Sequence, residues 1–101
     1  MIRNVVTGRL REPADDAQRA RDEAELDAGL AGIAALELPG QLGNHVGRDL
    51  RLRDGGWDFA ITNDWADAEA YRGYDTDPEH NDHRARIVEV CRSISRVQFE
   101  I

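Results

Sequence analysis

The stretch from Trp57 to Trp65, WDFAITNDW, constrains the fold more than any other part of the chain, because two kinds of side chain alternate along it. A period of two places successive side chains on opposite faces of a β-strand, so only one face of this strand suits a hydrophobic core. We predict that both tryptophans pack in that core. The predicted core face carries Trp57, Phe59, Ile61, Asn63 and Trp65, and the opposite face carries Asp58, Ala60, Thr62 and Asp64.

Three further segments have the patterns of strands. Residues 2–10, IRNVVTGRL, are rich in β-branched side chains and contain no proline. Residues 45–52 precede an Asp-Gly-Gly turn at 54–56, which joins them to the strand at 57–65. Residues 95–101, SRVQFEI, alternate apolar and polar side chains. The sequence therefore predicts four strands.

Two helical regions separate these strands. The first follows Pro13, carries an apolar stripe at helical spacing and closes at Pro39-Gly40. The second region is split, because Asp67 caps a short helix and Asp77-Pro78 is a strong signal for a new helix start. This last helix is expected to run to about Arg92. The stripe of the first helix consists of Leu26, Leu30, Ile33 and Leu36.

The order of these elements, βαββαβ, predicts an α+β domain of the ferredoxin-like type. In that fold a four-stranded antiparallel sheet carries the helices on one face. We further predict that the first and third strands are parallel neighbours at the centre of the sheet. That arrangement implies two ion pairs on the open face, Arg3 with Asp58 and Arg9 with Asp64. Such pairs suit either a solvated sheet face or a face that meets a second sheet.

Length and charge limit the kinds of partner. With 101 residues the chain forms one domain, residues 1–101, whose small core favours a dimer. A net charge of -7 argues against nucleic acids and anionic membranes, which would repel the chain. The single cysteine, Cys91, excludes an internal disulfide and is interpreted as a buried structural thiol on the last helix. Without a leader pattern or an apolar run of membrane length, we expect a cytoplasmic protein.

The segment DTDPEHNDH, residues 75–83, contains several possible metal ligands. An EF-hand loop counted from Asp75 needs glycine and glutamate at its sixth and twelfth positions, where this chain has His80 and Arg86. His80 and His83 share a helix face, but a third zinc ligand at a diagnostic spacing is missing. We therefore predict no metal site and no cofactor. The acids serve the helix start or the solvent: Asp77 caps, Glu79 lies in the first turn, and Asp75 and Asp82 face water.

His80 is the residue of this segment best suited to proton transfer. It lies about three residues into the helix, where the positive end of the helix dipole disfavours imidazolium, although Asp77 and Glu79 favour it. Tyr74 lies just before the cap and can donate a hydrogen bond to a developing enolate or thioester oxygen while His80 acts as base. The sequence is equally consistent with a His80 that bonds locally and a Tyr74 that packs in the core.

Several motifs together resemble the stress-responsive A/B barrel domain (Dabb) family. They are Gly47-Arg48-Asp49, then Trp57-Asp58 after a glycine turn, then the most specific one, Tyr-x-x-x-Pro-x-His at Tyr74, Pro78 and His80. The resemblance covers essentially the whole chain. It implies a ferredoxin-like domain that forms a homodimer through its sheet face, giving a dimeric α+β barrel with a cavity between each sheet and its helices. Family members are linked to stress tolerance, and some related members are polyketide cyclases that use a Tyr and a His in that run.

The chain departs from the family pattern at two positions. Asp77 stands where a His usually precedes the proline, and Asn4 stands where a His is common on the first strand. An Asp caps a helix at least as well as a His does, so the first change is structural. The second change removes a possible acid or base from the cavity wall.

Three functional interpretations follow. In the first, the cavity binds a small hydrophobic or aromatic ligand, and Tyr74 and His80 support polyketide cyclase-like carbonyl chemistry. The second is a non-catalytic stress-responsive or structural protein. The third is a haem-binding or antibiotic-type monooxygenase, because Asn4, Tyr74 and His83 imitate the Asn, aromatic and His of relatives with a similar layout. The residues expected to line the ligand site are Asn4, Val6, Phe59, Ile61 and Asn63.

Overall fold

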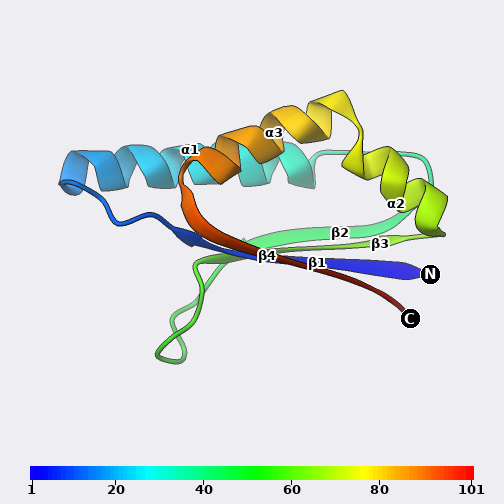
Figure 1. Cartoon of the computed structure of the whole chain (residues 1–101), viewed down its shortest axis with the longest axis horizontal. Coiled ribbons are helices and arrows are strands. Elements are labelled where there is room, and N and C mark those ends of the chain that lie inside the picture. The colour runs from blue at the N-terminus through cyan, green and yellow to red at the C-terminus, as the bar shows by residue number, and fades with distance from the viewer.

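The computed structural model describes residues 1–101 as two layers, a sheet and a set of helices that cover one of its faces (Figure 1). The sheet order is β2-β3-β1-β4, and every neighbouring pair of strands is antiparallel. This confirms the ferredoxin-like fold. None of the helices is both long and apolar enough to span a membrane. The strands are β1 (Ile2–Leu10), β2 (Gln41–Arg48), β3 (Phe59–Trp65) and β4 (Cys91–Glu100), and the helices are α1 (Asp16–Ala34), α2 (Ala68–Asp75) and α3 (Pro78–Glu89).

The prediction that β1 and β3 are parallel is wrong, because the two strands run antiparallel. Strand β3 lies between β1 and β2 and is antiparallel to both. Strands β1 and β2 therefore share one direction, and β3 has the opposite one. This register places Arg3 opposite Asp64, where the side chains form two hydrogen bonds of 2.8 and 3.0 Å. The predicted pairs of Arg3 with Asp58 and of Arg9 with Asp64 therefore do not form.

Trp57 lies outside the core, contrary to prediction. Strand β3 begins only at Phe59, so Trp57 no longer follows the alternation of the strand. Its ring instead lies under the guanidinium of Arg9, at 4.5 Å from the ring centre, which is a cation–π contact. Trp65, at the other end of β3, is fully buried as predicted.

Aspartate caps begin all three helices. The side chains of Asp15, Asp67 and Asp77 each accept a hydrogen bond from the backbone N–H three residues further on, at 2.7, 2.8 and 2.9 Å. The predicted caps at Asp67 and Asp77 are confirmed. Pro78 occupies the first position of α3, where a missing N–H costs nothing, whereas Pro13 precedes α1 by several residues.

Cys91 belongs to a strand and not to the last helix, so its predicted placement is wrong. Helix α3 ends at Glu89, because the backbone from Cys91 onward pairs with β1, beginning opposite Leu10. The thiol is half-buried, and burial, together with the charges of Asp58 and Asp22, raises its pKa to about 11. Cys91 is thus protonated at neutral pH, as expected of a structural thiol.

The core consists of two apolar clusters between the sheet and the helices. Close helix packing supports it, because a Cβ atom on Gly29 of α1 would lie 2.5 Å from the side chain of Ile87 on α3. The larger cluster contains Leu26, Leu30, Ile33, Phe59, Ile61, Ile87 and Val90, and the smaller one contains Leu36, Trp65 and Tyr74.

Beyond Ile94, which lines the helix side, strand β4 turns polar side chains toward the helices and apolar ones outward. Gln98 bonds to a buried residue of β1, whereas Val97 and Phe99 on the opposite face are 56% and 45% exposed. On this open side of the sheet the connection between β2 and β3 also projects away from the helices (Figure 1). It carries two leucines, Leu50 and Leu52, that are among the most exposed apolar residues of the chain.

Candidate functional site

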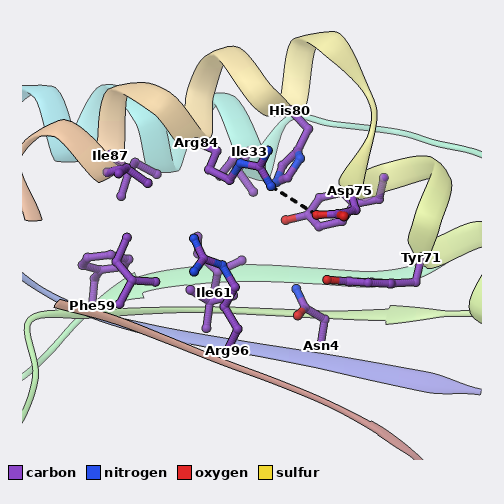
Figure 2. Close-up of a pocket in the computed structure, with 14 residues that line it drawn as sticks. Asn4, Ile33, Phe59, Ile61, Tyr71, Asp75, His80, Arg84, Ile87 and Arg96 are labelled. Atoms are coloured by element: carbon purple, nitrogen blue, oxygen red, sulfur yellow. Dashed lines mark hydrogen bonds and ion pairs between the residues drawn. The ribbon is translucent and has the colours of Figure 1, made fainter.

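A small cavity lies between the inner face of the sheet and helices α2 and α3 (Figure 2). Its volume is about 40 Å³, far below the several hundred Å³ of a site that encloses a drug-sized ligand. The lining is apolar at the end near Phe59 and polar at the end near α2. It consists of Asn4, Val6, Ile33, Phe59, Ile61, Tyr71, Tyr74, Asp75, His80, Arg84, Ile87, Val88, Ile94 and Arg96.

His80 lines this cavity from the first turn of α3. The residue is 4% exposed, and its Nδ1 atom is buried without a hydrogen-bond partner. Burial lowers the pKa of the imidazole, and the nearby charge of Arg84 lowers it further; the side chains of Asn81, Asp75 and Asp77 act in the opposite direction. The net result is a neutral ring at physiological pH, which can accept a proton.

Tyr74, at the end of α2, stacks against His80. The two ring centres are 3.9 Å apart with the planes tilted by 34°, and the Trp65 ring lies on Tyr74 at 4.7 Å. Burial raises the pKa of the phenol, while the Asn63 side chain partly offsets that effect. The cavity therefore brings a protonated phenol beside a neutral imidazole, as proton transfer with hydrogen-bond assistance requires.

A row of carboxamides crosses the floor of the site from β4 to α1. Gln98 Nε2 donates to Asn4 Oδ1 at 2.9 Å, and Asn4 Nδ2 donates to Asn63 Oδ1 at 3.0 Å. Asn63 Nδ2 approaches Asn44 Oδ1 at 3.4 Å, and Asn44 Nδ2 donates to the carbonyl of Ile33 at 2.8 Å. Asn4 and Asn63 are almost fully buried, so this row fixes the polar part of the floor.

The structure brings together six of the seven residues predicted for the site. Tyr74, His80, Asn4, Val6, Phe59 and Ile61 all line the cavity. Asn63 does not, because its carbonyl oxygen also accepts a hydrogen bond from Trp65 Nε1 at 2.8 Å, and the side chain is only 1% exposed. It holds Asn4 and Trp65 in place from behind the lining.

Three charged residues at the mouth of the cavity were not anticipated from the sequence. Asp75 faces water as expected, with 48% of its side chain exposed, and it also forms an ion pair of 3.1 Å with Arg84 beside the cavity (Figure 2). Arg96 reaches the same gap from β4. The only sequence signal for Arg84 is its position one helical turn after His80, on the same face of α3. Arg96 has no such signal, because the alternation along β4 does not say which face is buried.

His83 takes no part in the cavity. Its ring packs on α1, where a Cβ on Gly32 would lie 2.2 Å from the imidazole, and its Nε2 is 3.9 Å from Glu79. The trio of Asn4, Tyr74 and His83 considered for haem binding is therefore not assembled around one hollow. The structure contains no group of three or more His, Cys, Asp or Glu side chains that could hold a metal ion.

The model of the stress responsive A/B barrel domain family matches residues 2–101. The chain belongs to this family. No functionally curated protein matches this Dabb domain.

Solved structures similar to the Dabb domain share its fold across nearly the whole chain. A dimeric ferredoxin-like protein of unknown function from Thermobifida fusca is 26% identical, with a TM-score of 0.76 and coverage of 99% of this chain and 90% of that chain. A dimeric ferredoxin-like protein from Bacteroides fragilis is 21% identical, with a TM-score of 0.82 and coverage of 99% and 95%. A variant of a cofactor-independent oxygenase from Streptomyces nogalater is 17% identical, with a TM-score of 0.67 and coverage of 99% and 91%. These low identities establish the fold and not a shared activity.

Proposed function

We propose that this Dabb domain binds a small hydrophobic or aromatic carbonyl compound in its cavity and supports polyketide cyclase-like chemistry on it. In this reaction His80 takes a proton from the carbon next to a carbonyl group, and Tyr74 donates a hydrogen bond to the carbonyl oxygen as it becomes an enolate. The enolate carbon then attacks a second carbonyl of the same molecule, and His80 returns the proton to the resulting alkoxide.

One observation carries the proposal: His80 is buried and has no hydrogen-bond partner at Nδ1, yet it stacks on Tyr74 at the wall of a hollow. Leaving a buried polar atom unpaired costs about 1–3 kcal/mol, so such an atom calls for an explanation. A ligand or a water that the ligand displaces supplies one. The combination of an unpaired imidazole with apolar walls is what a base acting on a carbon acid needs.

The cavity also limits the size of the ligand. At about 40 Å³ it takes only the reacting end of a larger molecule, unless side chains at the mouth move. Tyr71 and Arg96 at that mouth come from α2 and β4; Tyr71 is partly exposed and Arg96 is exposed. A ligand that enters between them places its carbonyl end beside His80.

The test is a thermal-shift and NMR screen with small aromatic and β-dicarbonyl compounds. A native-state ligand at 100 times its Kd raises the free energy of unfolding by about 2.7 kcal/mol, which a melting curve detects easily. The expected result is stabilisation that is lost in Tyr74→Phe and His80→Gln. His83→Gln is the matched control, because it removes the other imidazole of α3 outside the cavity. Equal stabilisation of all four proteins would place the ligand elsewhere and refute the proposal.

A non-catalytic role is the second candidate, and the small volume of the cavity favours it. If the family fold serves only as a structural or stress-responsive module, no compound in the screen stabilises the protein, and Tyr74→Phe and His80→Gln bind the protein's partners as the wild type does. A separate assay tests for catalysis: each compound that binds is incubated with the protein and product is measured. A catalytic role predicts that product forms with the wild type and not with His80→Gln.

We also propose that the functional unit is a homodimer joined through the open sheet face. The apolar side chains of β4 on this face are unusually exposed for a monomer, and the projecting connection between β2 and β3 adds two exposed leucines beside it. Similar solved structures are described as dimeric. The two sheets would then enclose the residues that a lone domain leaves in water.

Sedimentation equilibrium at micromolar concentration tests the dimer. Val97→Asp places a charge on the sheet face proposed as the interface and is expected to yield monomers. Ala28→Asp, at an exposed position of α1 on the helix side and outside the cavity, is the control and is expected to leave the dimer intact. A wild-type protein that sediments as a monomer would contradict the proposal.

A further inference from the structure

Two guanidinium groups face the mouth of the cavity from opposite sides. Arg84 descends from α3 and Arg96 rises from β4, and both line the hollow that also contains Tyr74 and His80 (Figure 2). Acids outnumber basic residues by 20 to 13 in this chain, so a spot with two positive charges stands out against its surroundings. Local charge of this kind selects for an anionic group on a ligand.

The charges of these two arginines are balanced differently. Arg84 is paired with Asp75 at 3.1 Å, and both side chains are partly exposed. Arg96 forms no salt bridge, although the structure contains ten such pairs. The site therefore holds one guanidinium with a partner and one that is free.

The geometry of the lining sets where an anionic group would lie. Arg84 follows His80 by one helical turn, so a group bound at Arg84 and Arg96 leaves its carbon skeleton beside the imidazole. The walls behind the mouth are formed by Ile33, Ile61 and Ile87, which suit a short unsaturated or aromatic skeleton. A carboxylate matches the fork of a guanidinium with two parallel hydrogen bonds.

We infer that the ligand of this cavity is a small carboxylic acid whose carboxylate is held at the mouth by Arg96, with Arg84 beside it. This inference rests on the proposed function, since it uses the same cavity, and it adds the substrate class and two residues that select it. Arg96 is the principal contact because its charge is free, whereas the carboxylate must share Arg84 with Asp75.

The experiment compares acids with their neutral amides of the same shape. Crotonate with crotonamide, and benzoate with benzamide, are titrated into the protein, and the His80 and Tyr74 ring signals are followed by NMR. Each acid is expected to bind about 10-fold tighter than its amide, which is the lower end of the range for a hydrogen bond to a charged group. The preference is expected to shrink as salt rises, because the mouth is partly exposed.

Two variants test whether Arg96 causes the preference for the acid over the amide. Arg96→Gln is expected to bind acid and amide alike, while Arg86→Gln, an arginine of α3 that pairs with Glu25 outside the cavity, keeps the wild-type preference. If acid and amide bind the wild type equally, or if Arg96→Gln still prefers the acid, the inference is overturned while the proposed function stands. If no probe shifts the His80 and Tyr74 signals, both are overturned.

Discussion

Replacing Asn63 by Leu is expected to destabilise the domain severely, because two buried donors share its carbonyl oxygen. Asn4 Nδ2 and Trp65 Nε1 donate to Asn63 Oδ1 at 3.0 and 2.8 Å, and Asn63 is 1% exposed. Leucine has a similar size but accepts no hydrogen bond. Each buried donor left unpaired costs about 1–3 kcal/mol, so Asn63→Leu should lower the free energy of unfolding by about 2–6 kcal/mol. That is a large part of the roughly 5–15 kcal/mol typical of a domain.

A double-mutant cycle separates this effect from a simple loss of packing. Asn4→Leu removes one of the two stranded donors, so Asn4→Leu/Asn63→Leu should cost less than the sum of the single variants. We expect a coupling free energy of about 1–3 kcal/mol, as for residues of one hydrogen-bond network. The partner on the other side, Gln98, is exposed and can turn to water, which keeps the cycle interpretable.

Urea unfolding followed by tryptophan fluorescence measures all four proteins, at one protomer concentration because dimerisation would otherwise shift the midpoints. With a slope of about 1–3 kcal/mol/M for a small domain, a loss of about 3 kcal/mol moves the midpoint by at least about 1 M. Single-variant costs that add to within about 0.5 kcal/mol would show that the buried amides act independently and would refute the reasoning.

Three further outcomes are expected. The pKa of His80, followed by NMR, should lie below the ordinary 6.5 and rise in Arg84→Gln. Between the folded pKa and 6.5 only the unfolded state gains a proton, so the contribution of His80 to stability is complete above pH 6.5 and is lost as the pH falls toward the folded pKa. A measured pKa at or above 6.5 would contradict this. Gly8→Ala should cost about 1–3 kcal/mol because its Cβ would lie 2.2 Å from the Phe59 ring, whereas Gly47→Ala, with open space around it, should cost clearly less; equal melting temperatures would count against this packing. Cys91 should react with iodoacetamide at pH 7.4 about 100-fold more slowly than a free thiol, because its pKa is about 11; rapid alkylation would show that the thiol is accessible and ionised.

The sequence predicted the parts of the fold that depend on local signals. The alternation in β3 and the aspartate caps at Asp67 and Asp77 concern neighbours in the chain, and the structure confirms them. The direction of β1 relative to β3 depends on how distant strands meet, and there the prediction was wrong. Trp57 was misplaced for a related reason, since a pattern does not show where a strand separates from the sheet.

The same difference between local and long-range signals applies to the residues of the candidate site. Tyr74 and His80 flank a single helix start, so their spacing in the sequence already indicated that they could meet. Arg96 comes from the far end of the chain and from the part of β4 where the apolar Val97 and Phe99 face outward, against the usual rule that apolar faces point to the core. Only a partner on the open face would make that pattern ordinary, and a single sequence does not show the partner.

The hydrogen bonds of the carboxamide row all run in one direction, from Gln98 to the carbonyl of Ile33. Each amide has a donating and an accepting end, so the orientation of one determines that of the next. The Ile33 carbonyl at one end can only accept, and the Trp65 indole can only donate, and both enforce the same direction. Position 98 must therefore offer a donor to Asn4, so a glutamate there would have to carry a proton to fit. With a glutamate at position 98, the cavity floor would keep its hydrogen-bond order only while that carboxyl group is protonated.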